Sequence, residues 1–187
     1  MAIKNSIVVI VALEDELGRE YVSSHIPVIY SGIGKVNAAI ATFKAIHEYH
    51  PNLIINFGTV GKIAPGLEGL IQIGKVVQRD MIVEPLAPRG TTPFSNKPHT
   101  YQSILDGLTC GTGDSFVTVQ DDWLIDNRID VVDMELYAIA SVAHEHQIDW
   151  ISYKFISDDA NESSGQEWAK QVNQGQALFL KKLQKHL

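Results

Sequence analysis

Two patterns of apolar positions recur along the chain: short continuous runs, which are typical of buried strands, and helical periodicity. A continuous apolar run from Ser6 to Leu13 predicts a buried strand. Short runs rich in β-branched residues predict further strands at 26–30, 51–59, 74–83 and 149–157, with another apolar run at 115–119. Helical periodicity spans Asn37 to Tyr49.

The second half of the chain contains one long polar segment and two further helical patterns. The segment from Glu84 to Lys97 is rich in Pro, Gly and Thr and predicts a surface loop. The stretch "VVDMELYAIA" at 131–140 predicts a strand end that leads into a buried helix. The C-terminal region predicts one helix with an apolar stripe, made of Trp168, Val172, Phe179 and Leu183. Such alternation of strands and helices predicts an α/β fold with a mostly parallel sheet, flanked by helices, in one domain spanning 1–187.

Composition and charge narrow the function classes. Apolar residues make up 45% and charged residues 20% of the 187 positions, which is typical of a globular domain. The formal charge of -7, without a Lys/Arg run, argues against a nucleic-acid groove or an anionic membrane surface and favours a small-molecule partner. No apolar run reaches the roughly 18 residues of a membrane helix. The single cysteine, Cys110, indicates a core residue in a reducing compartment, hence a cytoplasmic protein, and the N-terminal apolar run is interpreted as a strand rather than a signal peptide.

Acidic and glycine-rich motifs follow the predicted strands, where ligand sites of parallel sheets form. "LEDE" follows the first strand, "SGIGK" the second, "GTVGK" the third and "SDD" the last. Glu135 stands in the middle of an apolar stretch, although burying an unpaired carboxylate costs several kcal/mol or more. We therefore expect a carboxylate-lined pocket with close approach of the backbone.

Structural alternatives exist for each of these acids. Glu14 to Glu16 could begin a solvated helix, and Asp158 with Asp159 could cap the last helix. Glu135 could be half of a structural ion pair. His144 and His146 do not share a helix face and lack neighbouring ligands, so no metal site is expected.

Several stretches, taken together, carry a family resemblance: "VALEDEL", "SGIGKVNAA", "NFGTVGKIAPGLEGLIQIGKVV", "GTGDSFV", "VVDMELYAIA" and "FISDDA". They resemble the nucleoside phosphorylase and nucleosidase superfamily, and within it the 5'-methylthioadenosine/S-adenosylhomocysteine nucleosidase branch. The resemblance implies a twisted, partly closed mixed sheet, a dimer or larger homo-oligomer, a nucleoside substrate and no cofactor.

The resemblance also implies roles for individual residues. Asp158 matches the acid that protonates purine N7, Glu135 the carboxylate that binds ribose hydroxyls, and Glu16 the residue that activates the attacking water. The expected substrate-binding residues are Phe116, which stacks on the base, Val117, Met134, Thr59, Gly61, Ser157, Leu13 and Ile33.

The sequence departs from the family pattern at several places. Lys154 stands where the nucleosidases usually have Arg, and the segments between Glu16 and Ser31 and between Asp80 and Gly111 are short. Arg89 or a partner subunit is expected to complete the pocket beside the 84–97 loop. Two alternatives stay open: phosphorolysis, for which Arg79 and Arg89 are candidate phosphate ligands, and a non-catalytic nucleoside-binding module.

Overall fold

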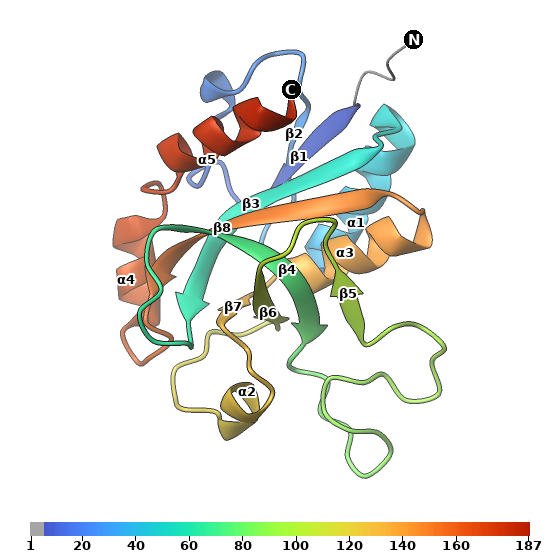
Figure 1. Ribbon diagram of the computed structural model, residues 1–187, viewed down its shortest axis with the longest axis vertical. Coiled ribbons are helices and arrows are strands. Elements are labelled where there is room, and N and C mark those ends of the chain that lie inside the picture. Colours follow the sequence, from blue (N-terminus) through green and yellow to red (C-terminus); the bar gives the residue numbers. More distant parts are fainter. Residues whose placement is uncertain (1–5) are drawn as a thin grey trace.

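The computed structural model describes residues 6–187, whose strands form an eight-stranded sheet. Figure 1 shows this sheet at the centre, with α1 and α3 on one side and α4 and α5 on the other. The strands are β1 (Ile7–Val11), β2 (Val28–Tyr30), β3 (Leu53–Lys62), β4 (Leu70–Gln78), β5 (Thr100–Gln102), β6 (Leu108–Thr112), β7 (Val131–Asp133) and β8 (Asp149–Asp158). The helices are α1 (Lys35–Tyr49), α2 (Asp122–Asp126), α3 (Leu136–Glu145), α4 (Ser164–Gln171) and α5 (Gln176–Leu183), with 3₁₀ turns at Arg19–Tyr21 and Gln184–His186.

The sheet is mixed and closes on itself. Strands β2, β1, β3 and β8 run parallel, and β4 returns antiparallel to β8. Strand β6 is parallel to both β4 and β7, and β7 pairs antiparallel with β3, which completes a ring of β3, β8, β4, β6 and β7. The prediction of an α/β fold with a mostly parallel mixed sheet is confirmed.

Alternating side chains of the buried strands supply two apolar cores. In β1, Val8 and Ile10 face the core beneath α1 and α3, while Ile7, Val9 and Val11 face the core beneath α5. Both sets are buried, which explains why the run is apolar throughout instead of alternating with polar residues. Burial of each such side chain contributes about 1.5–3 kcal/mol.

Some predicted boundaries were wrong. Strand β4 begins at Leu70 and ends at Gln78, before the apolar residues 81–83. The 115–119 run lies outside the strands, in the loop that follows the end of β6 at Thr112. The predicted C-terminal helix is two helices, α4 and α5, separated at 172–175, where Asn173 and Gly175 have low helix propensity. Residues 84–97 form a loop as predicted.

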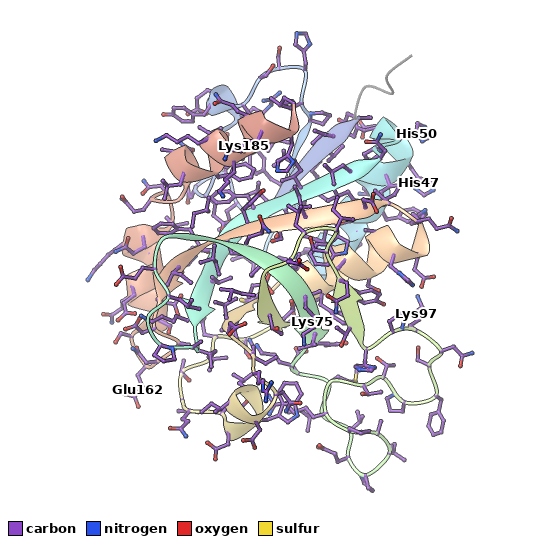
Figure 2. The ribbon with its side chains drawn as sticks, viewed as in Figure 1. His47, His50, Lys75, Lys97, Glu162 and Lys185 are labelled. Carbon is purple, nitrogen blue, oxygen red and sulfur yellow. The ribbon has the colours of Figure 1, made fainter. Side chains whose placement is uncertain are left out.

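The periphery of the molecule carries most of its charged side chains (Figure 2). In Figure 2, His47, His50 and Lys97 lie along one side of the molecule, and Glu162 lies on the opposite side. Lys97 contacts Glu145 of α3 at 3.3 Å, which ties the 84–97 loop to that helix. Within residues 6–187, no helix is both long enough and apolar enough to span a membrane.

Candidate active site

A cavity of ≈ 290 Å³ lies at the carboxyl ends of β1, β3, β7 and β8. All the residues predicted for the site line it: Glu16, Glu135, Asp158, Phe116, Val117, Met134, Thr59, Gly61, Ser157, Leu13 and Ile33. The fold therefore brings together side chains that are up to 145 positions apart, Leu13 and Asp158 being the extremes. Their functional roles remain predictions.

Glu16 lies in the turn after β1 and is almost fully buried. Its Oε1 accepts hydrogen bonds from the backbone N–H and the hydroxyl of Thr59, both at 2.8 Å, and its Oε2 accepts one from the Leu13 N–H at 3.2 Å. Burial raises the pKa of Glu16, although the charge of Lys154 and these hydrogen bonds oppose the shift. The alternative of a solvated helix start is wrong, since no helix begins there.

Glu135 precedes the first residue of α3 and is also buried. Its Oε1 accepts a hydrogen bond of 2.9 Å from the N–H of Gly34. Gly34 is the N-cap residue of α1 and has a positive φ of 95°, which glycine adopts without strain. Burial, together with the charge of Asp133, raises the pKa of Glu135 to about 7. Among the described residues Glu135 has no salt-bridge partner, which argues against the structural ion pair.

The buried ion pair of this region joins Asp133 and Lys154, at 2.8 Å. Asp133 also accepts hydrogen bonds from the Thr112 hydroxyl and the Leu136 N–H, at 2.6 and 2.9 Å. Burial opposes ionisation of Asp133, but Lys154 and these hydrogen bonds lower its pKa. Burial alone would lower the pKa of Lys154, yet the charges of Asp133 and Glu135 raise it. Asp133 lines the cavity and was missed by sequence reasoning, although its position two residues before Glu135 was a usable signal.

Asp158 is the last residue of β8 and faces β3. It accepts hydrogen bonds from the Ser157 hydroxyl at 2.8 Å and from the Ala160 N–H at 3.1 Å. A Cβ at Gly61 would lie 2.7 Å from Asp158 Oδ1, so only glycine leaves room for the carboxylate. The capping alternative for Asp158 and Asp159 is wrong, because α4 begins at Ser164, with Ser163 at its N-cap position.

Phe116 and Val117 lie in the loop after β6, which Arg79 holds in place. The Arg79 guanidinium donates to the Gly113 carbonyl at 3.0 Å, to the Ser115 hydroxyl at 3.2 Å and to the Ser115 carbonyl. Burial lowers the pKa of Arg79.

Arg89 does not reach the cavity, contrary to one of the expectations for the 84–97 loop. Its guanidinium pairs with Asp121 at 2.6 Å and packs over the Trp123 ring at 4.4 Å. The loop therefore contacts the segment after Phe116 and supplies no charge to the cavity.

Trp168 was predicted to lie on an apolar stripe, yet it lines the cavity from α4. Its indole N–H donates a hydrogen bond of 2.9 Å to the Thr59 hydroxyl. The helical period indicates which residues share a face but not whether that face meets a core or a cavity, so the sequence held no signal for this role.

The arrangement combines carboxylates of different ionisation in one concave site. Glu135 is poised to titrate near neutrality, whereas Asp133 is held ionised by Lys154. Buried negative charge of this kind stabilises a developing cation more strongly than it would in water.

A sheet that gathers buried acids and apolar side chains around a cavity at its strand ends is typical of an α/β enzyme with a small-molecule substrate. The family model described as "Phosphorylase superfamily" matches residues 14–187, and the chain belongs to this superfamily.

Individual relatives show which members of the superfamily the chain is similar to. The chain is 32% identical over 158 residues to a 5'-methylthioadenosine/S-adenosylhomocysteine nucleosidase of Shewanella sediminis, covering 72% of this chain and 68% of the relative. It is 28% identical over 172 residues to the Bacillus subtilis protein of the same name, covering 78% of this chain and 73% of that one.

Solved structures share the fold. A Helicobacter pylori nucleosidase of the same name, in complex with butyl-thio-DADMe-Immucillin-A, superposes with a TM-score of 0.87 at 20% identity, covering 99% of this chain and 100% of that one. A futalosine hydrolase mutant from Helicobacter pylori gives a TM-score of 0.86 at 19% identity, covering 97% of this chain and 99% of that one.

Proposed function

We propose that this chain is a nucleosidase that hydrolyses the N-glycosidic bond of a purine nucleoside of the 5'-methylthioadenosine/S-adenosylhomocysteine type. The observation that carries the proposal is the convergence of Glu16, Glu135 and Asp158, from three separate segments, on one cavity. The names of the relatives support the substrate class.

Each acid has a defined task in the proposed reaction. Asp158 donates a proton to N7 of the base, which makes the base a better leaving group. Glu135 accepts hydrogen bonds from the ribose hydroxyls, and its charge stabilises the oxocarbenium-like transition state more than the neutral substrate. Glu16 takes a proton from the water that attacks the anomeric carbon.

The charge of the cavity favours water over phosphate as the nucleophile. Four carboxylates line the cavity: Glu16, Asp133, Glu135 and Asp158. Arg79 also lines the cavity, but its guanidinium is bound to backbone carbonyls and to the Ser115 hydroxyl, and the Lys154 ammonium is bound to Asp133. With Asp158 protonated as the proposed acid, the carboxylates of Glu16, Asp133 and Glu135 still outnumber these two cations, so a phosphate dianion would meet net negative charge, which disfavours phosphorolysis.

An assay with and without phosphate tests the proposal. Methylthioadenosine, S-adenosylhomocysteine, adenosine, inosine and futalosine are each incubated with the protein, and released base and sugar product are quantified. We expect base release without phosphate and a sugar lacking a 1-phosphate. Strict phosphate dependence contradicts hydrolysis, and saturable binding without any base release identifies a non-catalytic binding module.

We further propose a homodimer or larger assembly in the cytoplasm, with the 84–97 loop near the subunit boundary. Apolar side chains are exposed on α1 at Val36, Ile40 and Phe43 and on the loop at Leu86 and Phe94, and partner burial would remove them from water. The buried thiol of Cys110 fits a reducing compartment. Light scattering at micromolar concentration should give at least twice the chain mass; a fully active monomer contradicts the assembly.

A further inference from the structure

We propose that Trp168 is a positioning residue for Glu16, acting through the hydroxyl of Thr59. This inference rests on the proposed nucleosidase function. Two hydrogen bonds, from Trp168 to Thr59 and from Thr59 to Glu16, form what we call the relay. Trp168 lies on α4, Thr59 on β3 and Glu16 in the turn after β1, so the relay joins three segments at one wall of the cavity.

The directions of the two hydrogen bonds follow from the chemistry of the groups. An indole N–H is a donor only, so the Thr59 oxygen must accept the 2.9 Å bond from Trp168 Nε1. A hydroxyl has a single proton, and an ionised carboxylate can only accept. The Thr59 proton is therefore directed at Glu16 Oε1, 2.8 Å away. Without the indole N–H, the hydroxyl is free to rotate away from Glu16.

The two carboxylate oxygens of Glu16 accept different numbers of hydrogen bonds. Oε1 accepts from both the hydroxyl and the backbone N–H of Thr59, each at 2.8 Å. Oε2 accepts only one bond, from the Leu13 N–H at 3.2 Å. A carboxylate oxygen has two lone pairs, so Oε2 is the oxygen that retains a free one for a water proton. Trp168 thus helps to keep Oε2 as the oxygen that acts as the base.

The same relay favours the ionised form of Glu16. Hydrogen bonds donated to a carboxylate stabilise its charge, which offsets the burial of this side chain at the bottom of the cavity. A base must be ionised to accept a proton, so weakening the relay lowers the fraction of active enzyme at neutral pH.

Replacement of Trp168 by Phe tests the relay, because Phe keeps an aromatic ring in the cavity and removes only the N–H group. We expect kcat to fall about 10-fold, KM to change less than about 2-fold, and the acid limb of the kcat profile to move up by about half to one pH unit. Trp123→Phe is the matched control, since Trp123 packs on Arg89 outside the cavity, and it should leave kcat and the pH profile unchanged.

A double variant separates the relay from a purely structural role. Thr59→Val should reproduce the shifted acid limb, and Trp168→Phe combined with Thr59→Val should be no worse than Thr59→Val alone, because both changes break one chain of bonds. Additive losses, or a Trp168→Phe variant with the wild-type kcat and acid limb, would overturn the relay alone. A wild-type protein without turnover would overturn the proposed function, and the relay with it.

Discussion

The floor and the rim of the cavity differ in burial and in the kind of side chain that forms them. The floor, which we define as Glu16, Asp133, Glu135 and Asp158, consists of acids at strand ends that are no more than 8% exposed. The rim, defined as Ile33 and Phe116, consists of loop residues that are 46% and 50% exposed. One chain is sufficient to arrange the charges of the floor, whereas the rim leaves apolar surface uncovered.

Backbone geometry explains the difference. Each acid of the floor accepts at least one hydrogen bond from another residue of the chain, and these donors lie at or near the ends of strands and helices. The rim residues lie outside strands and helices, so their positions depend on side-chain contacts. Changes in the floor should therefore reduce turnover, and changes in the rim should alter substrate affinity.

Asp158→Asn is expected to have the largest effect, because Asn keeps the shape of the side chain but cannot protonate the base. Turnover should fall about 1,000-fold, with ligand affinity within about 3-fold of wild type. Steady-state kinetics and isothermal titration with a non-hydrolysable nucleoside measure the two quantities. Unchanged turnover would remove Asp158 from the mechanism.

Glu135→Gln should lower turnover about 100-fold, since it removes charge that stabilises the cationic transition state. The free energy of unfolding should hold or rise, because an unpaired buried charge has been removed. Thermal unfolding and kcat are measured on the same preparation. A destabilised variant with full activity per folded molecule would show that Glu135 is structural.

The pH dependence of activity and of stability should run in opposite directions. Since the pKa of Glu135 is about 7 in the folded protein, against an ordinary value of 4.5, kcat/KM should fall at least about 10-fold per pH unit well below neutrality, and more steeply where Glu16 is protonated too. The folded state binds this proton more readily than the unfolded chain between these two values, so the contribution of Glu135 to stability is lost as pH rises from 4.5 to 7.

Comparison with Glu135→Gln isolates this contribution from other titrating groups. The variant should gain stability relative to wild type as pH rises through that window, and the gain should level off above it. Denaturant unfolding at several pH values gives the difference. A constant difference would mean that Glu135 has an ordinary pKa.

Phe116→Leu, a change in the rim, should have the smallest effect. Loss of aromatic stacking on the base should raise KM about 5-fold to 10-fold and change kcat less than about 2-fold. Tyr21→Leu, in the exposed 3₁₀ turn Arg19–Tyr21, is a control that should leave both constants unchanged. An effect of Phe116→Leu on kcat alone would contradict the assignment of substrate affinity to the rim.

The sequence predicted three acids of the floor, Glu16, Glu135 and Asp158, and missed the fourth, Asp133. A buried strand needs a continuous apolar run, so an acid or glycine that ends the run marks the edge of the sheet, as Glu16, Gly61 and Asp158 do. The family resemblance added the roles of these residues, which the pattern alone could not assign.

The features that the sequence did not reveal depend on spatial neighbours. The Asp133–Lys154 pair joins β7 to β8, which are not adjacent strands, so only the closed sheet brings the two charges together. Short strands such as β5 are too brief for a periodic signal. Because α4 and α5 are separate helices, Trp168 on α4 lines the cavity while Phe179 on α5 lies in the apolar core.

The most direct test of the account is the fate of solvent oxygen during cleavage of methylthioadenosine. The reaction is run in heavy-oxygen water with excess phosphate, and the sugar product is analysed by mass spectrometry. The account predicts that each sugar released carries one solvent oxygen at the anomeric carbon. A sugar 1-phosphate without solvent oxygen would contradict it.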